Sequence, residues 1–120
     1  MVVTVIVVAG VFFVSMGLYA LAAPAALVRP FGIVPEQATA RAEVRAVYGG
    51  FGLAIAGMLG YAAATPSVRT GVLITVGAAL AGMAFGRIVS SIIDGRTSFY
   101  PSWFYCLVEV IAAAALFWAA

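Results

Sequence analysis

The chain has 120 residues, of which 66% are hydrophobic and 8% are charged, and its formal net charge is +2. A globular domain is ordinarily about 25% charged because its surface must face water, so this composition excludes a soluble fold and predicts one small polytopic membrane domain. The cations are all arginines and form no basic stripe, which excludes a nucleic-acid partner. Without histidine, and with Cys106 as the single cysteine, ligands for a conventional zinc site are lacking, and we expect no metal and no cofactor.

Residues 2–23 form an uncharged apolar run. At about 1.5 Å per residue, such a run crosses the roughly 30 Å hydrocarbon core of a bilayer. The alternative is a cleaved signal peptide, which the small residues before Pro24 would suit. A signal peptide has a basic amino-terminal region and an apolar core of about 7–15 residues, whereas this run is uncharged and longer. We therefore expect residues 2–23 to form the first spanning helix.

The first connection contains three prolines: Pro24, Pro30 and Pro35. They cannot share one straight helix, because each lacks a backbone donor and restricts the residue before it. The segment between the last two prolines, residues 31–34, is apolar, so we expect this loop to lie in the membrane interface. A new helix is expected to begin at Pro35 and Glu36, since proline and an acidic residue both suit a first helical turn.

The second span, residues 39–64, carries charge only in its first turns. At helical spacing, one face of this span collects an arginine, a tyrosine and small residues: Arg45, Tyr48, Gly49, Gly52, Ala56 and Gly60. In lipid, a glycine face lets another helix approach closely. No strand precedes these glycines, so a dinucleotide-binding loop has no structural context here. We expect Gly49 and Gly52 to pack against a neighbouring helix.

A turn at residues 65–69 separates the second span from the third, residues 70–93, which repeats a small residue at every fourth position: Ala78, Gly82, Gly86 and Ser90. Gly82 and Gly86 form the G-x-x-x-G pattern typical of packed transmembrane helices. A polar stripe runs beside it: Arg87, Ser90, Ser91 and Asp94. The sequence thus predicts both a packing face and a polar face on this helix.

Asp94 and Gly95 favour a tight turn, and the aromatic-rich residues 99–105 are typical of a helix that enters from the membrane interface. The last span, residues 102–120, has Glu109 as its only charge. Four antiparallel spans joined by one longer and two short connections predict an all-α bundle of four transmembrane helices.

Orientation follows from the arginines. Five of the six lie in or beside the first and third connections: Arg29, Arg41, Arg45, Arg87 and Arg96. The positive-inside rule then predicts that these connections are cytoplasmic and that both termini lie outside. Heavy use of alanine, glycine and arginine without lysine favours a bacterial source, and we expect the bacterial inner membrane.

Three charges are expected at matched depth. Counted from the nearest helix ends, Arg45, Arg87 and Glu109 each lie about 7–11 Å below the same surface. A lone charge at the bilayer centre costs about 2.5–3.5 kcal/mol, so we expect the three to form one network, with Tyr48, Ser91 and Asp94 as polar partners. Such a network either fixes which helix faces meet or lines a site for an anion, a lipid head group or a proton; the excess arginine keeps the second interpretation open.

Enzymatic interpretations find little support. The sequence has no histidine and no pairing of a nucleophile with a base, and a thiol in an apolar helix, as at Cys106, ordinarily serves as packing. Proton-coupled multidrug exporters are similar in length and helix number, but their essential acid is in the first helix, which has no acid here. We expect no catalysis.

The chain resembles a family of small bacterial four-helix membrane proteins of unknown function. The likeness extends from Pro24 onward and is carried by Arg45-x-x-Tyr48-Gly49-Gly50, then Arg87, then Asp94-Gly95, then Glu109. It implies a multi-pass membrane protein with no established activity.

Two functional hypotheses follow. The first is a non-catalytic accessory or stabilising subunit of a larger membrane assembly, such as a lipid or envelope transporter, which contacts membrane lipid and other subunits through small-residue helix faces. The second is a small homo-oligomeric transporter, or a unit that binds an anion or lipid head group, using Arg45, Arg87 and Glu109.

Overall fold

The structure, a computed structural model, describes all 120 residues and contains helices and connections but no strand. Four helices are long and apolar enough to cross a membrane: Val2–Ala22, Ala38–Ala64, Pro66–Asp94 and Phe99–Ala119. The predicted all-α, four-span fold is confirmed. The first span is α1 (Val2–Ala22) and the third is α5 (Pro66–Asp94).

The second span contains a wider π-helical turn, and the fourth begins with a kinked turn. In the second span, α3 (Ala38–Val44) continues through the π-helical residues Arg45–Gly50 into α4 (Phe51–Ala64). In the fourth, residues Phe99–Trp103 form an irregular turn, with non-helical backbone at Tyr100 (φ −95°, ψ 134°), that leads into α6 (Phe104–Ala119). A π-helical turn closes i→i+5 hydrogen bonds, so it rotates the side chains before it relative to those after it.

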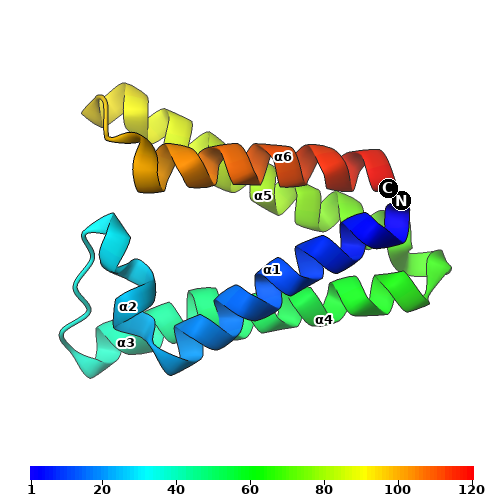
Figure 1. The fold of residues 1–120 in the computed structure, drawn as a ribbon, viewed down its shortest axis with the longest axis horizontal. Coiled ribbons are helices and arrows are strands. Elements are labelled where there is room, and N and C mark those ends of the chain that lie inside the picture. The colour runs from blue at the N-terminus through cyan, green and yellow to red at the C-terminus, as the bar shows by residue number, and fades with distance from the viewer.

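The long helices form two antiparallel pairs, α1 with α4 and α5 with α6 (Figure 1). Both chain ends and the turn at Thr65 lie at one end of the molecule, here called the terminal end. The first and third connections, residues 23–37 and 95–98, lie at the opposite end, here called the loop end. The two pairs meet at the terminal end and diverge toward the loop end.

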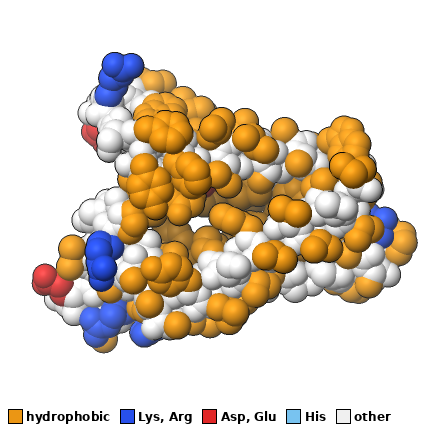
Figure 2. Space-filling view, viewed as in Figure 1, with side chains coloured by type: hydrophobic (Ala, Val, Ile, Leu, Met, Phe, Trp, Pro, Cys, Tyr) orange, Lys and Arg blue, Asp and Glu red, His pale blue; other side chains and the backbone are white.

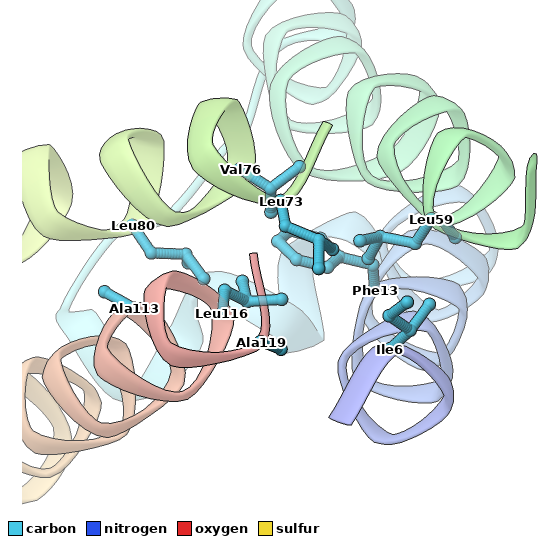
Figure 3. Packing of buried hydrophobic residues seen from close by; sticks show 10 residues of the cluster. Ile6, Phe13, Leu59, Leu73, Val76, Leu80, Ala113, Leu116 and Ala119 are labelled. Atoms are coloured by element: carbon cyan, nitrogen blue, oxygen red, sulfur yellow. The ribbon is translucent and has the colours of Figure 1, made fainter. Parts of the chain in front are cut away.

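The main apolar core joins the two pairs. Side chains from all four spans converge there (Figure 3), among them Ile6, Phe13, Leu59, Leu73 and Leu116. Because lipid tails are as apolar as these side chains, the core gains its stability in a membrane from close van der Waals packing.

The expected helix boundaries need three corrections. The third span begins at Pro66, not at residue 70, because proline at a first helical position lacks only a donor that would be free anyway. Arg69 is helical and donates to the carbonyls of Ala62 and Ala63 at the end of α4, so Thr65 alone separates the two helices. The second span begins at Ala38, one residue from the predicted 39–64, and the helical turn expected at Pro35 and Glu36 is absent. The fourth span begins at Phe99, not at residue 102.

The first connection is more ordered than the sequence analysis predicts. It contains a short helix, α2 (Pro24–Val28), and a 3₁₀ turn, Arg29–Phe31. Pro24 begins α2, where a missing N–H is harmless. Arg41 donates to the carbonyls of Pro35 and Glu36, which closes the connection against the start of α3.

Glycines set the spacing between α1 and α4. A Cβ atom added at Gly49 would lie 2.7 Å from the Leu21 side chain, and one at Gly52 would lie 3.3 Å from the Phe13 carbonyl oxygen. Gly17 faces them from α1. The structure therefore places Gly49 and Gly52 where α1 approaches closely, so that a larger residue at either position would require its neighbours on α1 to move.

Gly82 and Gly86 differ from Gly49 and Gly52 because no other helix of the chain packs against them. Both are exposed, and a Cβ added at either would meet no atom within 4 Å. The G-x-x-x-G pattern of α5 therefore contacts no other helix of this chain and faces its surroundings.

Candidate functional site: an ion pair between α5 and α6

Arg87 on α5 and Glu109 on α6 form a two-pronged ion pair. The Arg87 Nε donates to Glu109 Oε1 at 2.8 Å, and its Nη2 donates to Oε2 at 3.1 Å. The exposed fractions of the side chains are 22% for Arg87 and 6% for Glu109. Two parallel, charge-assisted hydrogen bonds are the strongest arrangement for this pair of groups. The pair thus holds α5 and α6 in one register.

Two aromatic rings cover the guanidinium. The Arg87 Cζ lies 5.6 Å from the Phe31 ring centre and 5.9 Å from that of Tyr105. The two rings also contact each other, with centres 5.5 Å apart. Cation–π contacts contribute about 0.5–2 kcal/mol, more where water is excluded. The Arg87 guanidinium therefore pairs with the Glu109 carboxylate and also contacts the Phe31 and Tyr105 rings.

Arg45 is not part of this pair, and the predicted three-charge network is wrong on this point. Its side chain is exposed, and its Nε donates to the Leu21 carbonyl at the end of α1, at 3.0 Å. The chain contains one ion pair, Arg87–Glu109. Arg45 begins the π-helical turn, so its side chain follows a different face from the one that regular α-helical spacing predicts.

The other residues predicted for the network also lie apart from it. Tyr48 is half-buried in the π-helical turn and donates no side-chain hydrogen bond, and the hydroxyl of Ser91 donates to the Ile88 carbonyl of its own helix at 2.7 Å. Asp94 is exposed at the end of α5 and forms no ion pair. None of the three touches the Arg87–Glu109 pair through a hydrogen bond.

Sequence reasoning missed Phe31 and Tyr105 as partners of Arg87. The sequence places both in apolar or aromatic segments at the membrane interface, and no spacing rule links a residue of the first connection to α5. The position of Phe31 between Pro30 and Pro35 is the one sequence feature that could have indicated this contact. Cys106 also contacts α5, with its Sγ 3.8 Å from the Ala84 carbonyl oxygen, which agrees with the packing role expected of it.

The two charges of the Arg87–Glu109 pair satisfy each other. Both oxygens of Glu109 accept hydrogen bonds from Arg87, so the carboxylate is occupied and the pair is neutral overall. Such a pair fixes helix positions.

The family model for a domain of unknown function, DUF4345, matches residues 2–120. The chain belongs to this family. The match covers all four spans, including the first, which lay outside the likeness noted in the sequence. Membership in a family without established activity is confirmed, whereas the sequence pattern and a bacterial origin remain predictions. No curated protein and no solved structure matches the chain.

Proposed function

We propose that this DUF4345 protein is a non-catalytic membrane subunit that packs against another transmembrane protein of a larger assembly through the outer face of α5. One observation carries the proposal. The face consists of small residues that are all exposed: Ala78, Gly82, Gly86 and Ser90.

The exposed glycines of α5 differ from the glycines that pack inside the molecule, and this difference supports the proposal. Gly17, Gly49 and Gly52 are used inside the molecule, where α1 meets α4. Gly82 and Gly86 lie four residues apart on one face of α5, and a Cβ atom added at either meets no neighbour within 4 Å. Each glycine in a helix interior costs about 0.8–1.0 kcal/mol relative to alanine, and in lipid the compensating gain comes from close contact with another helix. A lipid or envelope transporter is our choice of host, because the exposed apolar segment 31–34 suits a protein working at the interface with lipid.

Purification in a mild detergent from the native membrane, followed by native mass spectrometry, tests this function. We expect the wild-type chain to be recovered with a second membrane protein, and the double variant Gly82→Leu/Gly86→Leu to lose it, because the added side chains separate the helices. Gly57→Leu on α4 is the matched control, since a Cβ there also meets nothing within 4 Å. Recovery of the wild-type chain alone as a monomer, or a partner retained by the double variant, would contradict the proposal.

A second candidate is a homo-oligomeric transporter or a unit that binds an anion or lipid head group. The observation that favours it is Arg45, whose Nη1 and Nη2 donate no hydrogen bond within the chain while its Nε is held by the Leu21 carbonyl. This leaves a positioned cation at the loop end. The same mass spectra distinguish the candidates: several copies of this chain with bound anionic lipid would favour the second.

We further propose that the loop end faces the cytoplasm of a bacterial inner membrane. Figure 2 shows most of the arginine colour gathered toward this end, whereas Arg69 donates to the last turn of α4 at the terminal end. The positive-inside rule associates this distribution with a cytoplasmic loop end. In a Cys106→Ser background, Ser67→Cys at the terminal end should react with an impermeant thiol reagent from outside, and Thr97→Cys should not. The opposite labelling pattern would reverse the proposed orientation.

A further inference from the structure

A hollow separates the two helix pairs. Figure 2 shows it between the α1–α4 pair and the α5–α6 pair, surrounded mainly by hydrophobic side chains. The core cluster joins the pairs toward the terminal end, and the helices diverge toward the loop end (Figure 1). The core therefore does not hold the two pairs together at the loop end, and other contacts must do so there.

The two pairs meet there through the first connection: the 3₁₀ turn Arg29–Phe31 packs on residues Phe99–Trp103, and the Phe31 ring contacts the Tyr105 ring. Phe31 belongs to the first connection, which packs on α1 and α3, whereas Tyr105 and Arg87 belong to the other pair. Of the aromatic ring pairs in the chain, Phe31–Tyr105 is the one that links the two helix pairs. In Figure 1 the segment that follows α2 reaches toward the start of α6.

The backbone presents Phe31 at the tip of a tight turn. Gly32 follows it with a φ of 75°, a left-handed conformation that glycine adopts without strain. The Gly32 N–H donates to the Arg29 carbonyl at 2.9 Å. Behind the turn, the buried residues Pro24 and Val28 anchor α2. The segment is thus fixed at its base and makes its contact with the other pair at its tip.

The contact at the tip can break easily. The Phe31 residue is 37% exposed, and in lipid a phenyl ring that leaves its neighbours meets hydrocarbon of similar polarity, so little hydrophobic free energy opposes the movement. Arg87 keeps both hydrogen bonds to Glu109 when Phe31 leaves, so no charge is stranded. The closed state is held at this tip by the Phe31–Tyr105 ring pair, by the cation–π contact of Phe31 with Arg87 and by packing of the turn on residues Phe99–Trp103. Because none of these is a hydrogen bond or an ion pair, we expect the closed state to coexist with a minor open state, populated at roughly 0.1–10%.

We propose that residues 24–31 form a strap that closes the hollow at the loop end through Phe31, and that release of this ring lets the helix pairs separate and admits lipid beside the Arg87–Glu109 pair. The strap is a conformational device of the fold and does not depend on the association proposed for α5. Release of the strap would let lipid reach the Arg87–Glu109 ion pair, which the Phe31 ring otherwise covers.

Pulsed electron–electron double resonance in lipid nanodiscs tests the strap. Spin labels at Val47→Cys in the first pair and Ile92→Cys in the second, both exposed, report the separation at the loop end in a Cys106→Ser background. We expect Phe31→Ala to raise the population of the longer distance roughly five-fold or more, because it removes a contact worth about one ring pair. Ile33→Ala is the control: an exposed apolar neighbour that makes no ring contact.

Two further variants keep the outcome decisive. Phe31→Trp retains an aromatic ring and should keep the short distance, whereas Phe31→Leu retains an apolar side chain without a ring and should open the pairs as Phe31→Ala does. Unchanged distances in both Phe31→Ala and Phe31→Leu would overturn the proposal. An equal increase in Ile33→Ala would also overturn it, because the effect would then belong to the loop in general.

Discussion

Glu109→Ala is expected to lower the free energy of unfolding by about 3–5 kcal/mol, the usual cost of removing one partner from a buried ion pair. Arg87 would keep its charge, with its side chain only 22% exposed, and would lose two hydrogen bonds at once. Since whole domains are stable by about 5–15 kcal/mol, this single change should remove a large share of the total. Thermal unfolding in detergent measures it.

Two further variants show whether the loss of stability comes from the unpaired charge of Arg87 or from the missing side chain of Glu109. Glu109→Gln keeps the shape and an accepting oxygen, so it should be milder but still destabilising. The double variant Arg87→Met/Glu109→Leu removes both charges and should recover much of the stability, because apolar residues can replace a buried pair at little cost. A Glu109→Ala protein that melts like the wild type would show that the pair contributes nothing to the bundle.

Gly17→Leu is expected to destabilise the protein by about 1–3 kcal/mol through overpacking. A Cβ at this position would lie 2.8 Å from Leu53 Cγ and 3.0 Å from the Gly49 carbonyl oxygen. The leucine side chain can move, but the carbonyl is backbone, so α1 and α4 must separate. Gly10→Leu on the same helix is the matched control, because a Cβ there meets nothing within 4 Å. Equal melting temperatures for the two variants would contradict the close approach at Gly17.

Apolar runs of sufficient length predict the four spans correctly, because each run is bounded by prolines, charges or an Asp-Gly turn. Helix boundaries are harder to predict: Pro66 and Ser67 are typical turn residues, yet both belong to α5, since proline is compatible with a first helical turn. The short α2 was not predicted, because five residues between two prolines carry no periodicity.

Depth along a helix could be counted from the sequence, and it placed Arg87 and Glu109 at the same level, where they meet. Depth says nothing about which way a side chain faces around the helix axis. Arg45 therefore had the right depth to be included and the wrong direction to take part, and its π-helical turn has no recognisable sequence signal. In the same way, the pattern at Gly82 and Gly86 indicates a packing face but does not say whether the neighbour belongs to this chain.

Arg87 alone neutralises Glu109, and Arg45 instead donates to the end of α1. Double-mutant cycles on the free energy of unfolding test this pairing directly, with one cycle for Arg87→Met and Glu109→Leu and a second for Arg45→Met and Glu109→Leu. We predict a coupling of about 0.5–3 kcal/mol or more in the first cycle, as for residues in contact, and additivity within about 0.3–0.5 kcal/mol in the second. Strong coupling between Arg45 and Glu109, with none between Arg87 and Glu109, would contradict the account.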